Sequence, residues 1–346
     1  MRAVVVDAFG APPSVREVPD PEPPPGGALV EVRATGLCRS DWHGWMGHDP
    51  AIRLPHIPGH EFAGVVVAVG AGVRDVAPGD RVTAPFCCGC GRCEPCRQGH
   101  TQLCDVDHQP GFSAPGTFAR LVAIPVADLN VVALPDDVAF ADVAALGCRF
   151  MTAHAAVTVR GRVAAGEWVA VHGCGGVGLS AVMLATALGA GVVAADVDPR
   201  ALELARGLGA VHLLDARDGD VADRVRELTG GGAHASIDAV GSAATCAASV
   251  LGLRKRGRHL QVGLLTGAEA APPVPMAAVI ARELEVLGVH GMAVDRYPEL
   301  LALVASGAVA PGRLVRRRIG LDAAPAALAA MGTAEAAAGI TVIDGP

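Results

Sequence analysis

The sequence is poor in aromatic residues and has no excess of positive charge. Only 3% of its 346 residues are aromatic, so aromatic side chains alone identify no substrate pocket. The net charge is −7, which argues against the basic surface that follows a nucleic-acid backbone, and no nucleic-acid partner is expected. The basic cluster at Arg254–Arg258 is short, and we expect it to form a solvated loop between two elements.

The sequence also lacks an apolar leader, an internal repeat and a low-complexity linker. Met1–Asp7 has the pattern of a strand rather than of a cleavable signal, so a cytoplasmic location is expected. Val169–Ala195 contains no charged residue and exceeds the ~20 residues that cross a bilayer. Its six glycines favour a strand, a glycine turn and a buried helix, so no membrane partner is expected.

Composition and length predict a globular chain of two domains. Hydrophobic residues make up 51% of the sequence and charged residues 18%, and ~150 residues form a typical domain. The first part has short alternating patterns typical of strands, whereas strands and helices alternate from Glu167 onward. Such alternation predicts an α/β, doubly wound parallel sheet. Strands are expected at 65–69, 81–83, 169–171, 192–196, 236–240, 260–262 and 340–343, and helices at 179–188, 201–208 and within an Ala-rich tail from about 291.

A glycine turn between a predicted strand and a predicted helix has the spacing of a dinucleotide site. In Gly173-Cys174-Gly175-Gly176-Val177-Gly178 the glycines permit the tight turn, the approach of a pyrophosphate and close packing of helix on strand. The helix N-terminus then offers its N–H groups to phosphate. Asp196 ends the next strand, where a carboxylate bonds the adenosine ribose and repels a 2′-phosphate. NAD is therefore favoured over NADP, although Arg200 is near enough in sequence to accommodate a phosphate.

Four cysteines lie close together in the sequence with the spacing of a metal site. Cys90, Cys93, Cys96 and Cys104 are separated by two, two and seven residues, so that one loop can supply four thiolates to zinc. Four protein ligands leave no open position, which indicates a structural zinc. Disulfides are the weaker alternative in a chain of this length. Cys87 and Cys88 fall outside the spacing and are interpreted as spectators.

Further motifs are scattered over the chain, and together they carry a family resemblance. Cys38-Arg39-Ser40-Asp41 lies upstream of Gly59-His60-Glu61, and Gly147-Cys148 is followed by Thr152-Ala153. With Gly79-Asp80-Arg81-Val82, the cysteine group and the glycine turn, these motifs cover nearly the whole chain. The sequence resembles the zinc-containing alcohol dehydrogenases of the medium-chain dehydrogenase/reductase superfamily.

The resemblance implies a second, catalytic zinc held by Cys38, His60 and Cys148. Two cysteines and one histidine leave a fourth position open for water or an alcohol. Glu61 matches a residue behind the metal that ligates it transiently, and Asp41 matches one that fixes the ring of His60. Zinc lowers the pKa of the alcohol, and the alkoxide gives hydride to the nicotinamide.

The resemblance also implies a proton relay and contacts to cofactor and substrate. Ser40 would accept the proton from the alcohol, and His43 would pass it to solvent, although a plain surface histidine is the alternative for His43. Arg39 and Thr152 match cofactor contacts, and Phe86 matches a substrate-pocket aromatic. Trp45 and Phe150 are pocket candidates, but aromatic side chains at such positions more often belong to a core. Further cofactor contacts are expected at Val240, Val262 and Val289.

The resemblance finally implies the domain arrangement. We expect a GroES-like β-rich catalytic domain at 1–150, with a structural zinc lobe at about 86–105. A Rossmann NAD-binding domain follows at 151–290, and 291–346 returns to the catalytic domain. The expected substrate is a small alcohol, aldehyde or ketone, and a homo-oligomer is expected, with a tetramer favoured over a dimer.

One residue departs from the family pattern, and two other functions remain as alternatives. Ile340 stands where many relatives carry an arginine that touches the cofactor pyrophosphate, which would weaken NAD(H) binding. A zinc-free quinone or enoyl reductase of the same superfamily would lack the cysteine and histidine ligands. A zinc-stabilised NAD(H)-binding sensor would need no proton relay.

Overall fold

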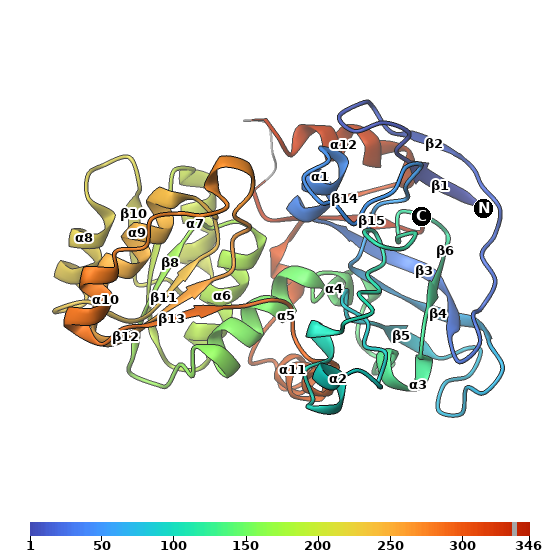
Figure 1. Ribbon diagram of the computed structural model, residues 1–346, viewed down its shortest axis with the longest axis horizontal. Helices are drawn as coiled ribbons and strands as arrows, with labels where there is room; N and C mark the ends of the chain where they lie inside the picture. Colours follow the sequence, from blue (N-terminus) through green and yellow to red (C-terminus); the bar gives the residue numbers. More distant parts are fainter. Residues whose placement is uncertain (334–337) are drawn as a thin grey trace. The chain divides into compact units, whose positions relative to one another are not determined.

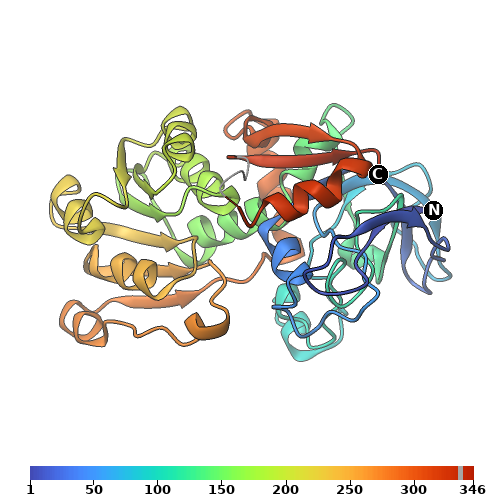
Figure 2. The same ribbon diagram turned by 90° about the horizontal axis from the view of Figure 1, so that it is seen from above.

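The computed structural model describes residues 1–333 and 338–346 and divides into two compact units. Unit 1 comprises Met1–Met151, Gly291–Val304 and Ala310–Pro346, and unit 2 comprises Thr152–His290 and Ala305–Val309. Both chain termini lie in unit 1 (Figure 2). The expected divisions follow residues 150 and 290, and the units divide after residues 151 and 290, with one short additional segment of the tail in unit 2.

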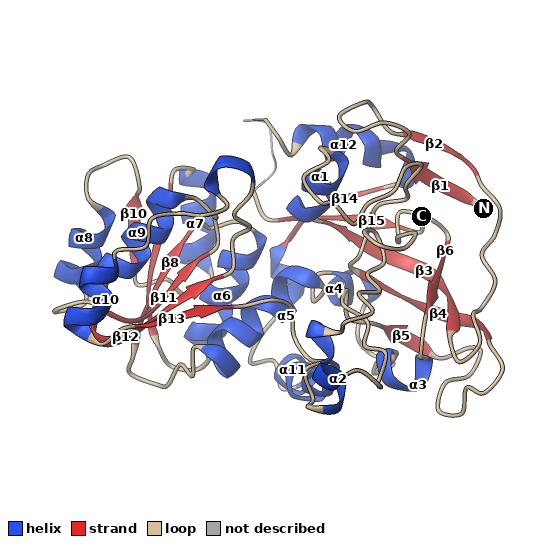
Figure 3. Cartoon of the chain, in the orientation of Figure 1, coloured by secondary structure: helices blue, strands red, loops and turns tan. Residues whose placement is uncertain are grey.

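Unit 1 is rich in β-structure (Figure 3). Its larger sheet has the strand order β14-β15-β3-β4-β5-β7, with β6 also paired to β3, while β1 and β2 form a separate antiparallel pair. The strands are β1 (Arg2–Val5), β2 (Ser14–Glu17), β3 (Ala28–Leu37), β4 (Phe62–Val69), β5 (Arg81–Thr83), β6 (Leu121–Ile124), β7 (Val132–Ala133), β14 (Val315–Ile319) and β15 (Ile340–Asp344). Strand β14 falls in the segment predicted to be helical, and that prediction is wrong there. Three of its five residues are arginines with exposed side chains, so its sequence lacks the apolar pattern of a buried strand.

The central strand of unit 1 is β3, which pairs with β4, β6 and β15. Val30 and Val32 point into a core with Phe62 and Val122, whereas Glu31 and Arg33 between and beyond them are less buried. This period of two is what places one face of a strand in the core. Because β3 ends at Leu37, the pairing also fixes the position of the next residue, Cys38.

Short helices connect the strands of unit 1 (Figure 1). They are α1 (Arg39–Trp45), α2 (Glu94–Arg97), α3 (Ala127–Asn130), α4 (Phe140–Ala144), α11 (Tyr297–Ala305), whose last residue belongs to unit 2, and α12 (Ala324–Ala330). Helix α5 (Cys148–His154) begins in unit 1 and continues into unit 2, where a π-helical turn at Ala155–Arg160 follows it.

Unit 2 contains a six-stranded parallel sheet in the order β10-β9-β8-β11-β12-β13. The order reverses between β8 and β11, which is the arrangement of a doubly wound sheet, so the predicted fold class is confirmed. The strands are β8 (Trp168–His172), β9 (Gly191–Asp196), β10 (His212–Asp215), β11 (Ala233–Asp238), β12 (Leu253–Gln261) and β13 (Glu285–Gly288).

Helices cover both faces of this sheet (Figure 1). They are α6 (Gly176–Ala187), α7 (Pro199–Gly207), α8 (Val221–Leu228), α9 (Ala243–Leu251) and α10 (Met276–Arg282). Alternate residues of β8 serve the two faces: Ala170 joins a core with Val225 of α8 and Val250 of α9, while Val171 lies beside Gly178 of α6. Charge-free Val169–Ala195 is thus a strand, a turn, a helix and a second strand, as predicted. Within the described residues no helix has both the length and the apolar character of a membrane span.

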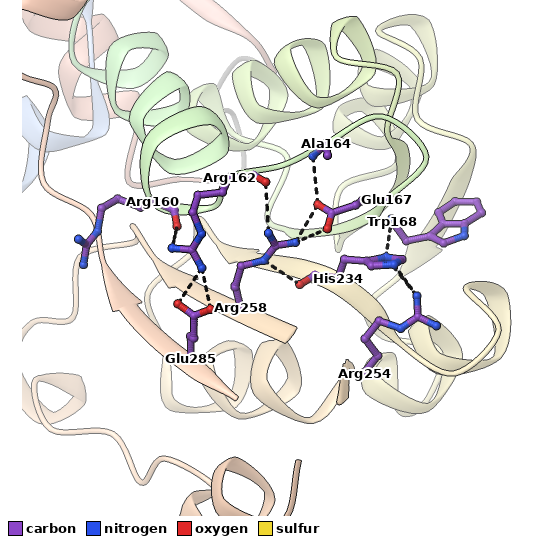
Figure 4. A network of polar contacts seen from close by, with 9 residues as sticks. All are labelled: Arg160, Arg162, Ala164, Glu167, Trp168, His234, Arg254, Arg258 and Glu285. Carbon is purple, nitrogen blue, oxygen red and sulfur yellow. Dashed lines mark hydrogen bonds and ion pairs between the residues drawn. The ribbon is translucent and has the colours of Figure 1, made fainter. Parts of the chain in front are cut away.

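The basic cluster at Arg254–Arg258 lies in β12, so its prediction as a solvated loop is wrong. Arg258 donates from Nη2 to both carboxylate oxygens of Glu167 at 2.7 Å, and from Nη1 to the carbonyl of Arg162 at 3.2 Å (Figure 4). Arg254 bonds the ring of His234, whose Nδ1 accepts from the backbone of Trp168. These partners offset the charges, which is why a basic segment can extend a parallel strand.

Candidate active site

Three elements of unit 1 bring the scattered cysteine and histidine residues together. Cys38 follows β3 as the N-cap of α1, His60 precedes β4, and Cys148 is the first residue of α5. One ligand atom from each of these residues and from Glu61 lies within 4.8 Å of all the others. Gly59, at φ +99°, takes a backbone conformation that glycine adopts without strain immediately before His60. The structure therefore assembles the ligand set that the resemblance implied.

The ring of His60 is oriented by Asp41, as the resemblance implied. Its Nδ1 lies 2.8 Å from Oδ1 of Asp41, and both side chains are fully buried. Its other nitrogen, Nε2, is buried without a hydrogen-bond partner among the described residues. A buried nitrogen of this kind is costly unless it binds something, and it lies in the group formed with the two thiols.

The electrostatics of the cluster also fit a bound cation. The hydrogen bond from Cys148, aided by the charge of Arg149, lowers the pKa of Cys38 well below its usual range. Burial by itself would lower the pKa of His60, but the charge and the hydrogen bond of Asp41 raise it. The pocket thus favours a thiolate at Cys38 and a neighbouring positive charge, while the hydrogen bond with Cys38 and burial raise the pKa of Cys148 well above its usual range. Two thiols and an imidazole are ligands that suit zinc.

Glu61 lies next to these ligands, and it is bound by a residue that was not predicted from the sequence. Arg149 donates from Nε and from its backbone N–H to Oε1 of Glu61 at 3.0 and 3.1 Å, and from Nη2 to Oε2. Both side chains are buried, and burial raises the pKa of Glu61 although Arg149 opposes the rise. Arg149 was detectable as a lone charge in the otherwise apolar run 143–153, but nothing in the sequence named its partner.

The four-cysteine group forms a second cluster, around α2 and a short helical turn at Thr101–Leu103. The sulfur atoms of Cys90, Cys93, Cys96 and Cys104 all lie within 4.8 Å of one another. Backbone N–H groups point at them: Cys90 N lies 3.2 Å from Cys104 Sγ, and Cys93 N lies 3.4 Å from Cys90 Sγ. The N–H of Arg92 helps to lower the pKa of Cys90 to about 6, which favours its thiolate, whereas burial and the hydrogen bond with Cys93 raise the pKa of Cys96 to about 12.

Cys87 and Cys88 are buried and lie next to this cluster in the sequence. Burial raises the pKa of Cys88 to about 12 and raises that of Cys87 well above its usual range. Neither belongs to a metal-ligand cluster among the described residues. Their interpretation as spectators agrees with this placement.

The predicted dinucleotide turn of unit 2 links β8 to α6. Gly173 has φ +89°, and a Cβ at Gly178 would lie 1.8 Å from the carbonyl oxygen of Gly173. Gly175 is the N-cap of α6, so the helix begins at Gly176, three residues earlier than predicted, and Val177 lies in its first turn. The first N–H groups of α6 therefore face the end of the sheet where β8 stops, and such a terminus favours an anion.

The other predicted cofactor residues of unit 2 lie at the same edge of the sheet. Asp196 ends β9, and its carboxylate accepts from the backbone N–H of Cys174 at 2.5 Å and of Asp198 at 2.8 Å. Arg200 is paired with Asp198 at 2.9 Å. Val240, Val262 and Val289 follow the carboxyl ends of β11, β12 and β13 by one or two residues.

The proposed relay residues lie on α1. Ser40 and His43 are three residues apart and so share one side of the helix. Nδ1 of His43 lies 2.9 Å from Nδ1 of His48, a contact that the sequence reasoning missed. Burial lowers the pKa of His43, and the charges of His48 and Arg39 add to the effect. Arg39 itself stacks over the ring of Trp42, 5.1 Å from its centroid, and donates to the carbonyl of Met331.

The aromatic candidates divide between site and core. Phe86 lies with its ring centroid 5.9 Å from that of His60, and Phe112, which the sequence reasoning missed, lies at 5.0 Å. Trp45 instead packs in a core cluster, with its indole N–H bonded to Ala11, and Phe150 is fully buried. These two residues have the core role that was left open for them.

Thr152 and Ile340 are both buried. The Oγ1 atom of Thr152 has no hydrogen-bond partner among the described residues. Ile340 begins β15, is 1% exposed and pairs with Val315 of β14. An apolar side chain therefore fills the position where the family pattern has a cation.

The comparisons with known proteins agree with this geometry. Residues 24–136 match the alcohol dehydrogenase GroES-like domain, and residues 176–306 match the zinc-binding dehydrogenase family. An alcohol dehydrogenase of Geobacillus stearothermophilus is 36% identical over 89% of this chain and 90% of its own length.

Solved structures extend the similarity to the entire fold. The alcohol dehydrogenase TADH from Thermus sp. ATN1 has a TM-score of 0.91 at 33% identity and covers 99% of both chains. A zinc-binding dehydrogenase from Sinorhizobium meliloti 1021, solved with bound NADP, has a TM-score of 0.90 at 32% identity and covers 99% of this chain and 98% of its own. With a GroES-like domain, a Rossmann-type parallel sheet and both cysteine clusters, the chain belongs to the zinc-containing alcohol dehydrogenases of the medium-chain dehydrogenase/reductase superfamily.

Proposed function

We propose that this protein transfers hydride between an alcohol and NAD, and from NADH to the aldehyde or ketone in the reverse direction. The observation that carries the proposal is the buried, unpartnered Nε2 of His60, grouped with the thiols of Cys38 and Cys148. Three such ligands leave a fourth position for substrate, which is the arrangement of a catalytic zinc. When bound, zinc would polarise the substrate oxygen and lower the pKa of an alcohol.

The residues around this cluster orient the ligands and move the proton. Asp41 accepts a hydrogen bond from Nδ1 of His60, which would leave Nε2 available to hold the metal. We propose that Ser40 takes the proton of the alcohol and that His43 passes it to solvent. The lowered pKa of His43 supports this role, because the neutral imidazole is the form that accepts a proton.

We further propose NAD as the preferred cofactor. Asp196 ends β9 as a carboxylate oriented by two backbone N–H groups, which suits a ribose hydroxyl and opposes a 2′-phosphate. Arg200 is paired with Asp198, so its charge is already offset. The N-terminus of α6 supports binding of the pyrophosphate.

Two zinc ions per chain are proposed, one catalytic and one in the four-cysteine cluster. None of the proposed ligand cysteines is in a disulfide, as metal ligation requires, and a cytoplasmic location is proposed with it. A homotetramer is proposed on the family resemblance alone. The sensor alternative is less well supported, since it gives no reason for Ser40 and His43 on one side of α1.

An alcohol and carbonyl panel with all four nicotinamide cofactors tests the proposal. We expect reduced cofactor to form from alcohols with NAD, and metal analysis to find two zinc ions per chain. One zinc per chain and no hydride transfer would contradict the proposal and favour the sensor alternative.

The cofactor preference has its own test in Asp196→Ala. Removing the carboxylate should raise the ratio of kcat/KM for NADP to that for NAD by roughly tenfold or more, since about 1.4 kcal/mol corresponds to tenfold. Asp218→Ala, an exposed aspartate of the same unit, is the matched control. An unchanged ratio in Asp196→Ala would remove the residue from cofactor discrimination.

A further inference from the structure

The carboxylate of Glu61 belongs to two groups at once. One of its oxygen atoms lies within 4.8 Å of the ligand atoms of Cys38, His60 and Cys148. The same carboxylate is bound by Arg149 on both of its oxygens. It is therefore placed either to complete the metal coordination or to remain with the arginine, and the two states differ in function.

A fourth protein ligand would close the site. Two thiolates, one imidazole and one carboxylate make a complete tetrahedral set, as in a structural zinc site. Catalysis on an alcohol needs that position free. Some feature of this chain must therefore keep Glu61 off the metal while substrate binds.

We propose that Arg149 is the positioning residue that holds Glu61 away from the metal and keeps the fourth coordination position open. This inference rests on the proposed function, because it presupposes a metal at Cys38, His60 and Cys148. Arg149 donates hydrogen bonds to the carboxylate of Glu61 from Nε at 3.0 Å, from its own backbone N–H at 3.1 Å, and from Nη2. A planar guanidinium holds a carboxylate at two points in a way that a lysine cannot.

The guanidinium is itself anchored to the strand that leads to Cys38. Its Nη1 donates to the carbonyl of Leu37, the last residue of β3, at 3.0 Å. The side chain of Arg149 is 6% exposed, so solvent does not compete for these bonds. Arg149 thus ties Glu61, the end of β3 and the start of α5 into one rigid group.

Gly36 and Gly147 pack closely against Glu61. A Cβ at Gly36 would lie 2.2 Å from Oε2 of Glu61, and a Cβ at Gly147 would lie 2.4 Å from its Cβ. The N–H of Gly36 also bonds the carbonyl of Glu61 at 2.8 Å. The hydrogen bond from Gly36 holds the backbone of Glu61, and the two glycines pack closely against its side chain. The position of the carboxylate therefore depends on the competition between Arg149 and the metal.

Charge favours the state with Glu61 on Arg149. Zinc with two thiolates and a neutral imidazole has no net charge, so a carboxylate ligand would make the site negative. Its movement to the metal would also leave Arg149 as a buried cation without a counter-charge, which is strongly unfavourable. Loss of Arg149 removes both obstacles to ligation by Glu61.

Cobalt substitution at the catalytic site tests the proposal without relying on activity. The probes are the visible ligand-field spectrum of Co(II) and the affinity of that site for imidazole, which takes an open position. In R149M we expect a changed spectrum and at least tenfold weaker imidazole binding. In E61Q we expect both readouts to stay close to those of the wild type, because Glu61 is not a ligand there. The double variant E61Q/R149M should regain the wild-type spectrum and affinity.

Each outcome decides between distinct conclusions. A wild-type spectrum and imidazole affinity in R149M would overturn the proposal, as would a changed spectrum in E61Q alone. If R149M does not fold, R149K is the second test. This variant retains the positive charge but cannot bind the carboxylate of Glu61 at two points, and unaltered imidazole binding in R149K would overturn the proposal. A wild-type protein that takes up cobalt only in the four-cysteine cluster would overturn the proposed function together with this inference.

Discussion

Asp41 accepts a hydrogen bond from Nδ1 of His60 at 2.8 Å, and the two side chains are completely buried. The same carboxylate also accepts from the backbone N–H of Cys38 at 2.8 Å and of Gly59 at 3.0 Å. The side chain of Asp41 thus fixes the ring of His60 and the main chain at Cys38 and Gly59. Because these bonds require an acceptor on both oxygens, Asp41 organises the cluster before any metal binds.

Asp41→Asn should weaken metal binding at the catalytic cluster. The amide nitrogen cannot accept, so at least one of the three hydrogen bonds is lost, and partners of metal-ligating histidines contribute roughly 10–100-fold to affinity. Zinc competition with a chelator measures the effect. Asp49→Asn is the control, since the carboxylate of Asp49 accepts from the backbone N–H of Ala51. Release of zinc from Asp41→Asn and wild type at the same chelator concentration would contradict this role.

Cys93→Ser should remove one of two zinc ions and lower the melting temperature. Its sulfur lies 3.8 Å from that of Cys104, within the four-cysteine cluster, and a site with four protein ligands contributes directly to folding. Metal analysis and thermal unfolding measure both effects. Cys88→Ala, which removes a buried thiol just outside the cluster, should retain two zinc ions. Loss of a zinc ion in Cys88→Ala would mean that the ligand set is a different one.

His48→Gln should move the acidic limb of alcohol oxidation to higher pH. Burial lowers the pKa of His43 first, and the charges of His48 and Arg39 lower it further, while Cys38 opposes them. Removing the charge of His48 therefore raises the pKa of His43, and the neutral base is lost at a higher pH. We therefore expect the acidic limb of the kcat/KM profile to lie at higher pH in the variant than in the wild type.

The control for this shift is His100→Gln, an exposed histidine in the four-cysteine lobe. It should leave the profile in place. A profile of His48→Gln that coincides with that of the wild type would separate His48 from the proton relay.

His172 should make the protein less stable in acid. Burial lowers its pKa to about 4, and the nearby charge of His259 contributes, although Asp238 opposes the shift. The folded state therefore binds the proton more weakly than the unfolded state, in which the pKa is ~6.5. The stabilisation is complete above about pH 6.5 and is lost as the pH falls toward 4.

Between pH 7 and pH 5 this group should cost about 2 kcal/mol of the free energy of unfolding. His172→Gln keeps a donor for Ser236, which lies 3.1 Å from Nε2, but does not titrate. Urea unfolding at the two pH values should therefore show a smaller acid loss in the variant. An equal loss in variant and wild type would mean that His172 is not the group responsible.

Ile340→Arg should have two opposite effects. A cation there should tighten NADH binding, as the family pattern implies, and unaltered affinity would refute that expectation. Ile340 is 1% exposed at the start of β15, so a buried charge should also lower the melting temperature. Ile340→Leu conserves the apolar volume and should change neither fluorescence titration of NADH nor thermal unfolding by much.

Secondary structure was predictable where the apolar pattern was clear. Strands β8 and β9 and helix α6 follow such patterns. The glycine turn that links β8 to α6 was also recognisable, because all of its glycines lie within six consecutive residues. The prediction was wrong at β14 and in the first part of β12, both of which contain clusters of arginine. Their strand conformation depends on the neighbouring strands and on partners such as Glu167, which are distant in sequence.

The sequence by itself determined the cluster of Cys90, Cys93, Cys96 and Cys104, because 15 residues in one loop suffice to close it. It did not determine the site of Cys38, His60 and Cys148, which the family resemblance implied and which pairing of β3 with β4 and the start of α5 bring together. The tertiary structure alone decided that Arg149 binds Glu61, 88 residues away. A buried charge needs a partner, but only the packed chain determines which carboxylate is within reach.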